Sequence, residues 1–146
     1  MTLPVPPSSA RDSWALHPQL AADTHPIASF ALSELRLMDD ANYPWLILVP
    51  RVPDARELID LEATLQTRLM QEIARVSHAL SAAFQPHKLN VAALGNVVAQ
   101  LHVHVIARYT DDPSWPAPVW GRAPARGYEP GALVERVQRL RAALDV

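Results

Sequence analysis

Three side chains that could do chemistry stand two residues apart in the segment AQLHVHVIARY, residues 99–109. They are Gln100, His102 and His104, with apolar residues between them. Because successive side chains of a β-strand point to opposite faces, a strand here places these three on one face and the apolar residues on the other. Imidazoles have little β-propensity, so two of them in register favour a chemical role over a face that is only solvated.

Three interpretations of the histidine pair are open. The histidines could be ordinary surface or hydrogen-bonded core residues. They could bind one metal ion, although such strand sites usually add a carboxylate nearby, and no Asp or Glu follows before Asp111. Alternatively, a neutral imidazole attacks phosphorus and holds a phosphoryl or nucleotidyl group covalently before passing it on. Free imidazole, with a pKa of about 6.5, suits that role because much of it is neutral at pH 7.

Amide donors that could hold phosphate oxygens precede the histidines. Residues 89–108 contain Asn90 and Asn96, and the turn at Gly95 offers backbone amides. The chain here resembles the histidine triad (HIT) superfamily of nucleotide hydrolases and transferases, whose signature alternates three histidines with apolar residues, commonly after Gly-Gln-x-Val. The resemblance extends over residues 35–108. The positions that fall in register are Gly95, Asn96, Val98, Gln100, His102, His104, Val105, Ile106 and Arg108.

The resemblance implies a role for each polar residue of the motif. His102 corresponds to the nucleophile, and His104 corresponds to the histidine that hydrogen-bonds the phosphate and organises the site. Gln100 stands where the family has its first histidine. A carboxamide can donate to a leaving-group oxygen but cannot deliver a titratable proton near neutral pH. The leaving group must then be a good one, or it must be protonated by another residue or by solvent.

The same resemblance implies residues that bind the substrate. Asn96 stands where the family often has a glutamine, and Asn90 lies close to the family's phosphate-contacting polar residue. Asp39 sits near the place where relatives contact the ribose, although Asp40 and Asn42 compete for that position.

Two further residues each have two interpretations. Arg108 either binds phosphate or pairs with Asp111 or Asp112. Trp120, like Trp115, either pins a loop to the body of the protein or, as a substrate contact, closes over the site of its own chain or of a dimer mate. Asp54 and Arg56 are interpreted as a turn and a helix start. The remaining histidines, expected to be structural or solvated, are His17, His25, His78 and His87.

Hydrophobic patterning predicts the strands that position these residues. Residues 30–40 and 45–51 are expected to form a hairpin-like pair around a turn. Residues 88–94 and 101–109 are expected to form two more strands, joined by a connection too short for a parallel crossover.

Two helices are predicted from apolar residues at three- and four-residue intervals. The longer has about six turns, with Asp60 as a possible N-cap and a stop at Pro86. Residues 132–145 predict a C-terminal helix. The apolar residues of the long helix are Leu61, Leu65, Leu69, Ile73, Val76, Leu80 and Phe84.

These elements predict an α+β fold in which an antiparallel β-sheet packs against one long helix and a C-terminal helix, as in HIT-like proteins. We expect a single HIT-like domain over residues 1–146. Residues 1–13 are expected to be a loose lead-in, and residues 111–131, rich in Pro and Gly, are expected to form a loop.

Composition narrows the classes of function. The 146 residues are 49% hydrophobic and 19% charged, which is typical of a soluble globular protein. No apolar run approaches the roughly 18 residues that span a bilayer, and the N-terminus lacks the pattern of a secretory signal. The absence of cysteine excludes a disulfide framework, thiolate metal sites and a cysteine nucleophile. A net charge of -2 without a basic block disfavours DNA and RNA. We therefore expect a cytoplasmic protein without a membrane or polymeric nucleic-acid partner.

The sequence thus predicts a nucleotide phosphate hydrolase or, less favoured, a nucleotidyl transferase that forms a covalent nucleotidyl-histidine intermediate on His102. The expected substrate is a dinucleoside polyphosphate or a nucleoside phosphoramidate, and no metal or other cofactor is expected. The resemblance also implies a homodimer. Two alternatives remain: a catalytically weak nucleotide-binding module, because Gln100 replaces a triad histidine, and a metal-dependent enzyme that uses the His102 and His104 pair.

Overall fold

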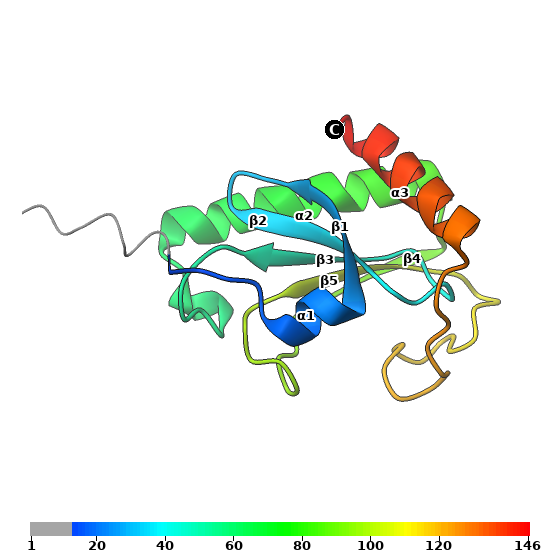
Figure 1. Ribbon diagram of the computed structural model, residues 1–146, viewed down its shortest axis with the longest axis horizontal. Coiled ribbons are helices and arrows are strands. Elements are labelled where there is room, and N and C mark those ends of the chain that lie inside the picture. Colours follow the sequence, from blue (N-terminus) through cyan, green and yellow to red (C-terminus); the bar gives the residue numbers. More distant parts are fainter. Residues whose placement is uncertain (1–12) are drawn as a thin grey trace, which may run out of the picture.

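An antiparallel sheet forms the centre of the computed structural model, which describes residues 13–146 (Figure 1). Across the sheet the strand order is β1-β2-β3-β5-β4, and each neighbouring pair is antiparallel. The predicted α+β fold is confirmed, as is the hairpin of the second and third strands. The strands are β1 (Thr24–Ser29), β2 (Ser33–Met38), β3 (Trp45–Pro50), β4 (Lys88–Ala92) and β5 (Val103–Arg108).

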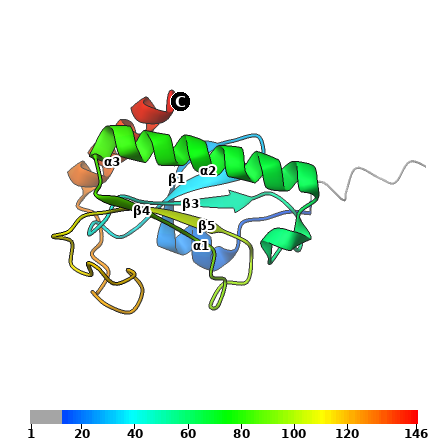
Figure 2. The same cartoon turned by 180° about the vertical axis from the view of Figure 1, so that it is seen from behind.

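Two helices lie on one side of the sheet. Helix α2 (Ala63–Phe84) runs along the sheet, and α3 (Pro130–Leu144) packs beside it (Figure 2). Helix α2 ends where the sequence predicted, because Gln85 adopts the left-handed conformation just before Pro86. Among the described residues, no helix is both long enough and apolar enough to cross a membrane.

The start of α2 corrects the predicted N-cap. Asp60 belongs instead to a 3-10 turn over residues 58–60, where its carboxylate accepts hydrogen bonds from the backbone amides of Arg56 and Glu57. These donors are available because the chain turns tightly ahead of the helix. The N-cap of α2 is Glu62, whose side chain makes no capping hydrogen bond.

The main core lies between the sheet and these helices. Leu101, Val103 and Val105 are buried there against apolar residues of α2 and α3, including Val76 and Leu140. The predicted division of the histidine segment into an apolar row facing the long helix and a polar row facing away is therefore found.

A smaller cluster covers the opposite face of the sheet. Helix α1 (Pro18–Asp23) lies on that side, away from α2, in both views (Figures 1 and 2). Its Leu20 belongs to a buried cluster with Ile106 of β5, Val98 and Val119. Residues 109–129 contain neither helix nor strand, and α3 begins at Pro130, inside the loop that was predicted over residues 111–131. Of the predicted lead-in, residues 1–12 lie outside the described residues.

Candidate active site

The His102 ring is held in a defined tautomer by the backbone. Its Nδ1 atom lies 2.7 Å from the carbonyl oxygen of Gln100. A carbonyl oxygen can only accept, so Nδ1 carries the hydrogen and donates it. In the neutral ring the lone pair is then on Nε2, which is the arrangement that a nucleophilic imidazole needs.

The His104 ring is held in the opposite tautomer by a side chain. The indole Nε1 of Trp45 donates a hydrogen bond of 3.0 Å to its Nδ1, and an indole nitrogen can only donate. The neutral ring therefore carries its hydrogen on Nε2. Burial of the ring, together with the positive charge that His102 can carry, lowers the pKa of His104 to about 3. His104 is thus a neutral hydrogen-bond donor at pH 7.

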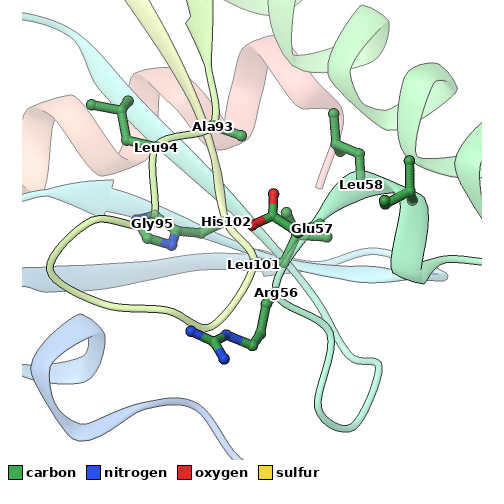
Figure 3. Close-up of a pocket in the computed structure, with 9 residues that line it drawn as sticks. Arg56, Glu57, Leu58, Ala93, Leu94, Gly95, Leu101 and His102 are labelled. Carbon is green, nitrogen blue, oxygen red and sulfur yellow. The ribbon is translucent and has the colours of Figure 1, made fainter.

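The two rings lie together, with centroids 4.9 Å apart. On one side, His102 lines a cavity of about 280 Å³, here called the His102 cavity (Figure 3). It is formed by the turn after β3 and by the segment between β4 and β5. Its lining residues are Arg56, Glu57, Leu58, Ile59, Ala93, Leu94, Gly95, Leu101 and His102.

A second cavity, here called the Asp39 cavity, has a volume of about 370 Å³. Trp45 and Trp120 line it and also pack against the His104 ring, with centroid distances of 5.7 and 5.0 Å. The histidine pair and the two tryptophans therefore lie between the two cavities. The residues that line the Asp39 cavity are Ala22, Asp23, Met38, Asp39, Asp40, Trp45, Val119, Trp120, Gly121, Ala123 and Ala125.

Comparison with known proteins shows the family to which the chain belongs. The model of the HIT domain matches residues 19–111. The chain belongs to the histidine triad family. The fold supports this assignment, because solved histidine triad proteins superpose on nearly the whole chain.

Three such histidine triad structures each have a TM-score of 0.88. The protein from Bradyrhizobium japonicum is 49% identical and covers 90% of this chain and 98% of its own. The protein from Sinorhizobium meliloti is 39% identical, with coverage of 91% and 98%. The protein from Marinobacter aquaeolei is 43% identical, with coverage of 90% and 96%. No curated protein matches the chain. Membership of the HIT family supports nucleotide binding with hydrolase or transferase activity in general.

The side chain of Gln100, predicted as a donor to the leaving group, is bound to the N-terminal segment. Its Oε1 accepts a hydrogen bond of 2.8 Å from the backbone amide of His17, and its Nε2 donates one of 2.8 Å to the carbonyl of Ala15. Both ends of the carboxamide are therefore engaged with the N-terminal segment. The Gln100 side chain anchors this segment, while its backbone carbonyl orients the His102 ring.

Arg108 pairs with Asp112, the second of its two predicted roles. Its Nε and Nη2 lie 2.8 and 3.1 Å from the Asp112 carboxylate oxygens, and its side chain is only 1% exposed. Two further donors go to the Asn90 side-chain oxygen and the Ala117 carbonyl. The predicted phosphate contact of Arg108 is therefore corrected, and Asn90, whose side-chain oxygen is taken, supports Arg108. Burial raises the pKa of Asp112, but hydrogen bonds from Arg108 and backbone amides outweigh this effect and hold it below its usual value.

Asp39 is better placed for a ligand than its two competitors. It is half-buried in the wall of the Asp39 cavity, and its Oδ1 lies 3.1 Å from the His25 Nε2. Asp40 lines the same cavity but is buried, and its Oδ1 accepts from the amides of Asn42 and Arg126. The Asn42 carboxamide donates to a loop carbonyl instead.

The last two predicted residues are Trp120 and Asn96. Trp120 packs edge-on against Trp45 and His104 of its own chain, so it both anchors the Pro-rich loop and lines the Asp39 cavity. Asn96 is exposed beside Gly95, whose φ of +73° is the left-handed conformation that favours glycine.

Sequence reasoning missed the contributions of Trp45 and of the turn that carries Arg56 and Glu57. Trp45 lies in an apolar run that reads only as a core strand, and nothing in its spacing marks it as the partner of His104. Among residues 13–146 no group of three or more His, Cys, Asp or Glu side chains could hold a metal ion.

Proposed function

We propose that this HIT protein is a nucleotide hydrolase, or less favoured a nucleotidyl transferase, that works through a covalent nucleotidyl-histidine on His102. The observation that carries the proposal is the hydrogen bond from His102 Nδ1 to the Gln100 carbonyl, which leaves the Nε2 lone pair available at the wall of a cavity. The substrate class is a dinucleoside polyphosphate or a nucleoside phosphoramidate.

The chemistry proceeds in two displacements. In the first, Nε2 of His102 attacks the phosphorus, the N–P bond forms, and the bond from phosphorus to the leaving group breaks with its electron pair on the leaving group. In the second, water attacks the phosphorus, the N–P electron pair returns to Nε2, and the water releases a proton to solvent. His104 donates from Nε2 to a phosphate oxygen in both steps, because its neutral tautomer keeps that hydrogen.

The two cavities suit the two parts of such a substrate. The Asp39 cavity has tryptophan side chains that can face a base and a carboxylate that can accept from ribose hydroxyls. In the His102 cavity, Gly95 and the exposed Asn96 beside it offer amide donors for phosphate oxygens. We place this reaction in the cytoplasm, without a polymeric nucleic acid or a membrane as partner.

A homodimer belongs to the proposal. Strand β4 is at the edge of the sheet, and beside it an apolar cleft of about 350 Å³ includes Val91 and Met70, which are 49% and 62% exposed. An unpaired strand edge next to apolar side chains suits pairing with a second copy of this chain. Analytical ultracentrifugation tests this, and Met70→Glu is expected to shift the protein toward monomer.

The decisive experiment looks for the covalent intermediate. Wild type and His102→Ala are incubated with a panel of dinucleoside polyphosphates and nucleoside phosphoramidates, quenched in alkali, and measured by intact mass. We expect a nucleotidyl adduct on wild type and none on His102→Ala. Because the Gln100 carboxamide is engaged elsewhere, a second candidate is a catalytically weak nucleotide-binding module. Wild type that binds AMP or GMP but forms no adduct and shows no turnover across the panel would favour that candidate.

A further inference from the structure

The wall of the His102 cavity opposite the nucleophile comes from the turn after β3. In Figure 3 the segment with Leu94 and Gly95 lies on one side of the cavity, and the turn that carries Arg56, Glu57 and Leu58 lies on the other. In an in-line displacement the leaving group departs on the side of phosphorus opposite the attacking atom. A substrate attacked by His102 therefore directs its leaving group toward the turn.

The turn is fixed relative to the nucleophile by backbone hydrogen bonds. The amide of Leu101, the residue before His102, donates to the carbonyl of Ala55 at 2.9 Å. The Asp60 carboxylate accepts from the amides of Glu57 and Arg56 at 2.9 and 3.0 Å, and these two bonds hold the pKa of Asp60 below its usual value. Asp60 thus keeps its charge at neutral pH and fixes the backbone of both charged residues.

Arg56 gives this wall an exposed cation, whose charge also helps to lower the pKa of Asp60. Among the residues that the structure describes, none forms an ion pair or a hydrogen bond with its guanidinium, whereas Arg108 is fully engaged with Asp112 and its neighbours. The amide of Asp60 donates to the backbone carbonyl of Glu57 at 3.0 Å, which closes the 3-10 turn beside Arg56.

The engagement of Gln100 limits which leaving groups can depart. Gln100 cannot protonate a leaving atom, because a carboxamide has no titratable proton near neutral pH, and this carboxamide is already bonded to Ala15 and His17. An alkylamine has a pKa of about 10 and must be protonated to leave at neutral pH. A phosphate group, with a second pKa of about 6, leaves as an anion without a proton.

We infer that the leaving group is a phosphate or polyphosphate anion bound by Arg56, so that the substrate is a nucleoside polyphosphate rather than a phosphoramidate. This inference rests on the proposed function. As Nε2 of His102 bonds to phosphorus, the P–O bond breaks and its electron pair stays on the departing phosphate oxygen. The guanidinium of Arg56 balances the charge that develops there, and no proton is transferred.

The test compares two substrates that share an adenylyl group, diadenosine tetraphosphate and adenosine 5′-phosphoropropylamidate. The rate of adduct formation on His102 is measured for each substrate by quenching and intact mass. Arg56→Gln is compared with Arg68→Gln, which removes the same charge from an exposed position of α2, and with Arg56→Lys. Urea unfolding of each variant verifies that it is folded.

We expect wild type to react faster with the polyphosphate. Arg56→Gln should lose about tenfold in rate with the polyphosphate, with little change for the amidate, as expected for a lost hydrogen bond to a charged group. Arg56→Lys should recover part of this loss, and Arg68→Gln should behave as wild type. A wild type that prefers the amidate, or an Arg56→Gln variant equally slowed with both substrates, would overturn the inference and leave the His102 mechanism standing. A wild type that forms no adduct with either substrate would refute the mechanism and this inference together.

Discussion

His104 makes the stability of the fold depend on pH over a defined range. The side chain is buried, and burial together with the charge of His102 lowers its pKa from 6.5 to about 3. Below pH 6.5 the unfolded chain therefore binds a proton that the folded chain does not, and the free energy of unfolding falls with pH until about pH 3. Between pH 7 and pH 5 the loss from this one residue is about 2 kcal/mol.

Urea unfolding at the two pH values, followed by tryptophan fluorescence, measures this loss. The free energy of unfolding of wild type should fall by about 2 kcal/mol more than that of His104→Gln, since each protein is compared with itself and other titrating groups cancel. His78→Gln, which removes an exposed histidine from α2, should keep the pH dependence of wild type. If wild type and His104→Gln lose equal stability on acidification, His104 is not the neutral buried ring that the site requires.

Three further substitutions test the supports of the site, each by urea unfolding at pH 7. Trp45→Phe removes the indole donor to His104 Nδ1 and should cost about 1–3 kcal/mol, whereas an unchanged midpoint would show that this bond does not hold the ring. Gln100→Glu replaces a donor with an acceptor facing a backbone carbonyl and should cost about 1–2 kcal/mol, part of which returns in acid as the new carboxylate is protonated. Asp112→Asn leaves the buried Arg108 unpaired and should cost about 3 kcal/mol; a loss below 1 kcal/mol would contradict the role given to this ion pair.

Hydrophobic periodicity predicted the helices and strands whose buried residues recur at regular intervals. It missed β1, which contains a proline, and α1, which is very short. The long helix and the strands around His104 follow their apolar patterns. Strand β1 contains Pro26, which lacks a backbone donor and so argues against a central strand. In the structure β1 is at the edge of the sheet, and its register shifts between Pro26 and Ala28, so the proline is tolerated. Helix α1 has six residues, too few to give a periodic signal.

The candidate site was predicted where chemistry follows from residue type and register, and it was misjudged where partners come from distant segments. The alternation around His102 and His104 specifies which face they share. The neighbouring sequence does not reveal that Gln100 is bonded to residues more than eighty positions away. Nor does it reveal that the guanidinium of Arg108 is hydrogen-bonded within the protein. Such partners depend on tertiary packing, which the pattern of a single strand does not encode.

Strand β5 carries both His104 of the candidate site and the arginine that anchors the loop after the strand. His104 and Arg108 are four positions apart on one face of the strand, and Arg108 holds Asp112, whose carboxylate gathers the backbone amides of Ser114 and Trp115. A slip of β5 by one residue against β3 would turn both side chains into the opposite core at once. The contact of His104 with Trp45 and the anchoring of the loop by Arg108 therefore both depend on one register of β5 against β3.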